Sequence, residues 1–120
     1  MLKAIKRLYD MLFPIMEWTG RWDSGNKEFP GLSKGNRIEI KADSSALFIG
    51  VITGSQIVVS YSFIGGSTAD NGMITQYACL PLSGDTLTYA NFRRIRFSLA
   101  GTPSYVEVSP AITSIRVWKV

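Results

Sequence analysis

The feature that most constrains the fold is a change in the spacing of apolar residues near Glu17. Before it, apolar residues recur every three or four positions, and after it they tend to alternate with polar ones. The first period is that of a helix and the second that of a strand. Glycine or proline interrupts the second pattern at short intervals, as tight turns between strands require. The sequence therefore predicts an all-β domain preceded by one short helix.

Residues 1–16 are predicted to form an amphipathic helix used for docking or oligomerisation. Pro14 ends it near Leu12 or Phe13, because proline lacks a donor N–H and restricts the residue before it. A helix of barely three turns is marginal in isolation, so it has to dock. Its own domain, copies of itself and a membrane surface are the alternatives, and membrane insertion is not expected. The predicted docking residues are Leu2, Ile5, Leu8, Tyr9 and Leu12.

Residues 17–120 are predicted to form one antiparallel β-sandwich or jelly-roll-like domain. Hydrophobic residues make up 46% of the chain and charged residues only 18%. This is too apolar for a disordered chain and too low in charge for a coiled coil. Strands are predicted near residues 17–23, 37–42, 46–53, 56–64, 73–80, 86–98, 104–108 and 112–119, with an irregular or extended piece around 29–32.

Two kinds of strand pattern predict different burial. In residues 37–42, apolar and charged residues alternate, which predicts one buried and one solvated face. Residues 47–52 and 57–64 are apolar on both faces. They are expected to be central strands or to have a second face covered by a neighbouring chain.

Local signals predict how several single positions are used. Gly54-Ser55 matches a two-residue type II′ turn, with a positive φ at Gly54. Trp18 and Trp22 have the same parity on their strand and are expected in the core. Cys79 is expected to pack in the core or an interface rather than to react.

The residue inventory argues against catalysis. The chain has no histidine and a single cysteine. An internal disulfide, a zinc site of histidine and cysteine ligands, and Ser-His-Asp or Cys-His catalysis are therefore excluded. The nine acidic residues are scattered singly, so a glycosidase with two carboxylates has no supporting motif. No phosphate-binding glycine loop is present. We expect a non-enzymatic protein with no cofactor and no metal.

The formal net charge of +4 is not concentrated in a basic tract. Nucleic acid is not an expected partner, because no aromatic interleaving accompanies the arginines near residue 94. Arg94 and Arg96 share one strand face, and a solvated surface, an interface salt bridge and an anionic glycan contact remain open for them. The full set of candidates for ligand or interface contact is Trp118, Arg94, Arg96, Thr68, Asp70 and Asn71.

Three short motifs occur in a fixed order. An aromatic-then-glycine run with a Ser-Gly turn spans residues 17–25, and a Leu-Ser segment leads into an alternating strand at 31–40. An Ile-x-x-Ile strand follows at 112–117, with Trp118-Lys119 where a glycine is expected. This order resembles modules in the C-terminal regions of many bacteriophage tail and fibre proteins. Residues 8–15 are similar to short passages ahead of phage tail domains, without the glycine that often follows.

The resemblance implies a virion structural module, commonly trimeric, in a fibre, a tail or baseplate, or a capsid decoration. Its partners would be copies of itself and other phage structural proteins. The chain would be made in the host cytoplasm and reside in the virion. The alternative is a host-receptor or carbohydrate-binding adhesion module, whose partner is a host-surface glycan.

Overall fold

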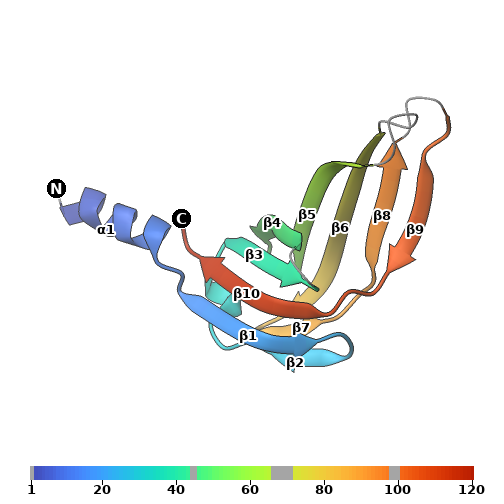
Figure 1. Cartoon of the computed structure of the whole chain (residues 1–120). Coiled ribbons are helices and arrows are strands. Elements are labelled where there is room, and N and C mark those ends of the chain that lie inside the picture. The colour runs from blue at the N-terminus through green and yellow to red at the C-terminus, as the bar shows by residue number, and fades with distance from the viewer. Residues whose placement is uncertain (1, 44–45, 66–71, 98–100) are drawn as a thin grey trace.

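The computed structural model describes residues 2–43, 46–65, 72–97 and 101–120. It confirms the all-β class, because a single helix precedes an antiparallel sheet that curls into a half-barrel (Figure 1). The elements are α1 (Leu2–Leu12), β1 (Met16–Trp22), β2 (Asn26–Glu28), the 3-10 helix η1 (Leu32–Lys34), β3 (Arg37–Ala42), β4 (Ala46–Ile52), β5 (Gln56–Gly65), β6 (Gly72–Ser83), β7 (Thr86–Thr88), β8 (Phe92–Phe97), β9 (Ser104–Val108) and β10 (Ile112–Trp118).

The main sheet follows the order β1-β10-β3-β4-β5-β6-β8-β9, with every neighbouring pair antiparallel. On the side away from β5, the long strand β6 pairs with two strands. Its first half pairs with β8 and its last residues pair with β7. β7 in turn pairs with β2, which lies below the curled sheet (Figure 1). β4 and β5 are central strands, as their apolar composition predicts.

The hydrophobic core lies where the curled sheet closes over β2 and β7. The alternation predicted for β3 is confirmed, with Ile38, Ile40 and Ala42 buried on the inner face. The predicted core positions of Trp18 and Trp22 are also confirmed. Trp22 is buried, Trp18 is half-buried, and their rings lie 5.4 and 5.2 Å from the ring of Phe29. These aromatic contacts close the lower end of the half-barrel.

The single strand predicted for residues 86–98 is wrong, because this segment forms two strands in different places. β7 pairs with β2, whereas β8 crosses to the far wall and pairs with β6 and β9. The amide of Tyr89 donates to the carbonyl of Gly25 at 2.9 Å, just where β7 ends. β2 was not predicted, since its three polar residues carry no alternating pattern.

The turn predicted at Gly54 is also wrong, and one of the two places expected for Cys79 is ruled out. The hairpin between β4 and β5 is antiparallel as expected, but Gly54 does not have a positive φ. Instead, the Thr53 hydroxyl closes the turn, accepting from the amide of Gln56 at 3.1 Å and donating to its carbonyl at 2.9 Å. Cys79 is exposed on the outer face of β6, which excludes the core and leaves an interface as its expected place.

Asp85 holds η1 against the turn between β6 and β7. Its carboxylate accepts hydrogen bonds from the Ser33 hydroxyl at 2.6 Å, the Ser33 amide at 2.9 Å and the Gly31 amide at 3.1 Å. Gly31 has a φ of 93°, which glycine adopts without strain. This contact fixes Leu32, which is fully buried, under the sheet.

The Asp85 contact predicts a pH-dependent stability. The hydroxyl of Ser33, followed by the amides of Ser33 and Gly31, lowers the pKa of the Asp85 carboxyl below its ordinary value. A lowered folded-state pKa stabilises the protein above the unfolded pKa, and this stabilisation is lost as the pH falls through the folded value. We expect the Asp85→Asn variant to have a lower Tm than the unsubstituted chain at about pH 7. The Tm difference between the two proteins should be smaller at about pH 3. An equal Tm difference at both pH values, measured by circular dichroism, contradicts the assignment.

Candidate functional site

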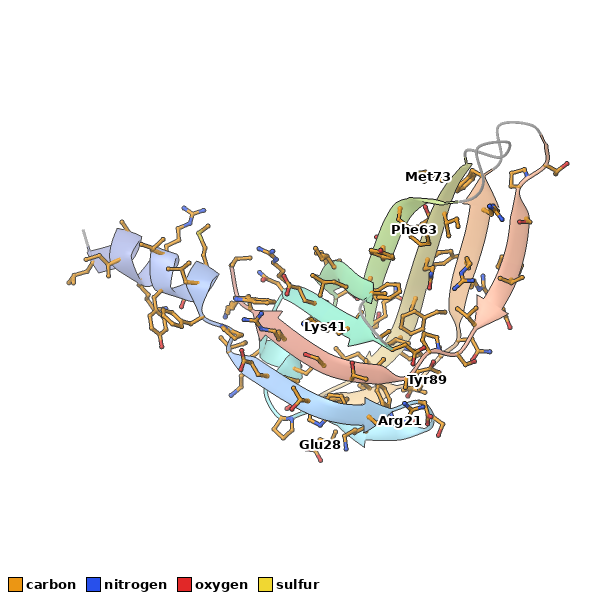
Figure 2. The ribbon with its side chains drawn as sticks, viewed as in Figure 1. Arg21, Glu28, Lys41, Phe63, Met73 and Tyr89 are labelled. Atoms are coloured by element: carbon orange, nitrogen blue, oxygen red, sulfur yellow. The ribbon has the colours of Figure 1, made fainter. Side chains whose placement is uncertain are left out.

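The inner face of the half-barrel contains a pocket of about 530 Å³. This volume falls within the range of small-molecule sites, which is roughly 300–1,000 Å³. The wall is formed by β3, β4, β5, β6 and β8 together with the segment that follows β9. In Figure 2, Phe63 lies on the β5 part of this wall. The residues whose chemistry matters here are Asp43, Phe48, Tyr61, Phe63, Gln76 and Arg94.

Gln76 is the one polar or charged residue among the described residues that is classed as buried, with 8% of its surface exposed. It lies on the inner face of β6 between Ile74 and Ala78 and lines the pocket. No other described residue forms a hydrogen bond with its side chain. Neither its amide nitrogen nor its amide oxygen is among the fully buried polar atoms without a partner, so the amide reaches the open side of the pocket. The pocket therefore contains a polar group whose hydrogen-bonding capacity the described residues do not use.

Arg94 lies beside Gln76. The two residues are direct cross-strand partners on β8 and β6, so their side chains emerge together on the inner face. The Arg94 side chain is exposed, and within the described residues no carboxylate lies within ion-pair distance of it. Arg96 shares this face, as parity predicts, but it is half-buried and already has an interaction partner.

Aromatic rings lie on the side of Gln76 away from Arg94, since Tyr61 on β5 is the other direct cross-strand partner of Gln76. The ring of Tyr61 lies 5.2 Å from that of Phe63 and 5.7 Å from that of Phe48. Tyr61 and Phe63 are half-buried, so part of each ring faces the pocket. The site thus combines flat apolar surfaces with an amide and a guanidinium group.

Asp43 lies at the pocket rim, at the end of β3. It is the one non-glycine residue among those described with a positive φ, at 50°. This conformation is uncommon, and aspartate tolerates it better than most residues. Its amide donates to the Ala111 carbonyl at 2.8 Å, and its Oδ1 accepts from the Ala111 amide at 3.3 Å. These two bonds hold the carboxylate beside the pocket.

The predicted docking residues of α1 all lie on one exposed surface, which we call the α1 stripe (Leu2, Ile5, Leu8, Tyr9 and Leu12). Their exposed fractions range from 56% to 84%, and α1 contains no buried residue. The helix projects away from the half-barrel (Figure 1). Packing on its own domain, one of the three alternatives, is therefore not what the structure shows.

The other predicted contact residues fall in three places. Trp118 is only 6% exposed, because the guanidinium groups of Arg116 and Arg37 lie over its ring at 5.0 and 5.5 Å from the centroid. Little of its ring is left for a ligand or an interface. Thr68, Asp70 and Asn71 lie outside the described residues. Among the members of the predicted set that the structure describes, only Arg94 is both exposed and part of the pocket.

No group of three histidine, cysteine, aspartate or glutamate side chains among the described residues could hold a metal ion. Within the same part of the chain, no helix is long and apolar enough to cross a membrane.

Sequence reasoning did not single out Gln76, Tyr61, Phe63 or Asp43. One signal was present, since Gln76 shares the parity of apolar inward residues in its strand. A polar residue at such a position needs a partner.

Comparisons of the chain with protein-family models, curated proteins and solved structures find no match.

Proposed function

We propose that the chain is a non-catalytic structural module that self-associates through the α1 stripe. The observation that carries this proposal is the exposure of all five stripe residues on a helix without any buried side chain. An isolated helix of 11 residues is marginal in water, so α1 needs a surface that covers this stripe.

Charge opposes a closer association between α1 and its own domain. A cleft of about 380 Å³ separates the polar side of α1 from the ends of β3 and β10. Cations predominate on both sides of it, with Lys3, Lys6 and Arg7 on the helix and Arg37 and Lys119 on the domain. One acidic residue, Asp10, also lines the cleft and pairs with Lys6 at 3.7 Å. The like charges on the two sides of the cleft repel each other, which favours an α1 that extends outward.

The spacing of the stripe favours a second copy of α1 as its occupant. Leu2, Ile5, Tyr9 and Leu12 follow one another at intervals of three, four and three residues. Alternating intervals of three and four residues follow the heptad pattern, which produces the narrow seam along which helices pack in coiled coils. The lysines and the arginine near the amino end stay on the solvated side in this arrangement.

The free energy gained by burying the α1 stripe alone exceeds the free-energy cost of association by little. Full burial of a leucine or isoleucine side chain contributes about 1.5–3 kcal/mol, and association costs about 4–15 kcal/mol. The outer face of the sheet supplies further apolar surface. Ile49 and Val51 on β4, Met73 on β6, Phe97 on β8 and Tyr105 on β9 are between 42% and 53% exposed there. We infer that these outer-face residues contribute to the same assembly.

The assignment to a phage particle, and the trimeric state, are supported by the resemblance of residues 17–25, 31–40 and 112–117 to tail and fibre modules. In that setting the chain is a fibre, baseplate or capsid-decoration component attached through α1. Its partners are copies of itself and neighbouring virion proteins.

The proposal predicts that polar substitutions in the stripe dissociate the protein. Ile5→Gln combined with Leu12→Gln removes two apolar contacts and leaves helix propensity nearly unchanged. We expect light scattering coupled to size-exclusion chromatography to give an oligomer, three copies on the phage assignment, for the unsubstituted chain. The double variant is expected to be a monomer.

The matched control is Lys3→Gln combined with Arg7→Gln, which makes the same kind of change on the polar side of α1. This variant should keep the oligomeric mass. A monomeric unsubstituted chain overturns the proposal, as does equal dissociation of the control. Circular dichroism on each variant verifies that the β-domain remains folded.

A further inference from the structure

We propose that the pocket on the inner face of the half-barrel binds a sugar that carries a carboxylate, such as a uronic acid residue. The proposal does not depend on self-association through α1. It rests on the chemistry that converges in the pocket from β5, β6, β8 and the end of β3. Each of the following groups contributes one element of recognition.

Gln76 supplies the first element. Its amide can donate two hydrogen bonds and accept two, and no described residue uses them. It is more than nine-tenths buried and lines the pocket. A purely apolar ligand would leave this amide without a partner, whereas the hydroxyl groups of a sugar both donate to it and accept from it. The buried amide therefore favours a hydroxylated ligand.

Arg94 supplies the charge preference. It is the direct cross-strand partner of Gln76, so a ligand on the amide lies within reach of the guanidinium group. Guanidinium groups form paired hydrogen bonds with carboxylates, which makes arginine the usual residue for carboxylate recognition. Because no carboxylate of the described residues occupies Arg94, this capacity is available to a ligand.

Tyr61 and Phe63 supply a flat surface for the sugar ring. Their ring centroids lie 5.2 Å apart, and both line the pocket. Aromatic faces pack against apolar C–H surfaces while polar groups at the edge remain solvated. A pyranose has such a surface on one side and hydroxyl groups around its edge. Asp43, held by Ala111 at the rim, is an acceptor for those hydroxyl groups.

The experiment titrates the full chain with glucuronic acid and, separately, with glucose, which differs from it only at the carboxylate. Side-chain and backbone amide signals are followed by ¹H–¹⁵N NMR. We expect saturable shifts of the Gln76 side-chain amide and the Arg94 Nε–H signal with glucuronic acid. Glucose should bind about tenfold more weakly or not at all.

Two variants assign the roles within the pocket. Arg94→Gln should reduce glucuronic acid affinity to the level of glucose. Gln76→Leu should abolish binding of both sugars, because a leucine side chain can neither donate a hydrogen bond to a hydroxyl group nor accept one from it. The control is Arg93→Gln, which changes the outer face of the same strand and should bind like the unsubstituted chain.

Three results overturn the proposal. The first is the absence of saturable shifts at Gln76 and Arg94 with glucuronic acid. The second is equal affinity for glucose and glucuronic acid, which removes the preference for an anion. The third is a loss of affinity in Arg93→Gln as large as that in Arg94→Gln, which places binding outside the pocket. Arg94 is exposed, so its variant tests the proposal even where Gln76→Leu does not fold.

Discussion

Replacing Gly50 with alanine is expected to cost about 3 kcal/mol or more of the free energy of unfolding. Gly50 lies in the middle of β4, opposite Val59 of β5. A Cβ atom at this position would collide with the carbonyl oxygen of Val58 and would lie 2.7 Å from its carbonyl carbon. These are backbone atoms of the neighbouring strand, so no side-chain rotation relieves the contact. The two central strands would have to separate.

Gly54→Ala is the matched control, since it makes the same change at the turn that follows β4. Its Cβ would meet no atom within 4 Å, and Gly54 does not have a positive φ. This variant should differ from the unsubstituted chain by less than about 1 kcal/mol. Urea unfolding followed by circular dichroism gives both values. Similar stability of the two alanine variants contradicts the close approach of β4 and β5 at Gly50.

Phe92→Ala is expected to destabilise the protein by about 3–5 kcal/mol. Phe92 is fully buried at the start of β8, and its ring lies 5.0 Å from that of Phe48 in an edge-to-face arrangement. The ring of Tyr89 lies 6.2 Å from that of Phe92. Truncation leaves a cavity where β8 turns from the closed end of the half-barrel to its outer wall. The loss therefore includes both the transfer of the ring and the cavity.

Phe97→Ala on the same strand is the comparison for this prediction. Phe97 faces outward and is 42% exposed, so its truncation should cost less than about 1 kcal/mol in the monomer. Equal destabilisation of the two variants, measured by urea unfolding, contradicts the inward placement of Phe92. In the assembled state, Phe97→Ala also reports on whether the outer face takes part in the interface.

The parts of the fold that were predicted from sequence depend on local signals. α1 ends at Leu12 because Pro14 prevents its continuation, and β3 has its predicted bounds because every second residue is charged. The error over residues 86–98 has a different cause. Apolar residues continue through both halves of this segment, and nothing local indicates that one half pairs with β2 and the other with β9. Strand partners depend on contacts between distant residues, which periodicity does not encode.

The pocket could be predicted only in part for the same reason. Parity alone places Arg94 and Arg96 on one face of their strand. The convergence of Asp43, Tyr61 and Gln76 on that face requires the curvature of the sheet. That curvature is a property of many strand pairs together, and no short motif specifies it.

The antiparallel pairing of β1 with β10 has a mechanical consequence. Met16 lies opposite Val117, so the chain enters and leaves the half-barrel at one end, beside α1. Tension applied between these two points would peel the strand pair apart, one pair of hydrogen bonds at a time. The pocket begins at the other end of β3, at Ala42. A load between α1 and a molecule held in the pocket is instead spread across several strands at once, so the domain should resist pulling in that direction far better than pulling by its ends.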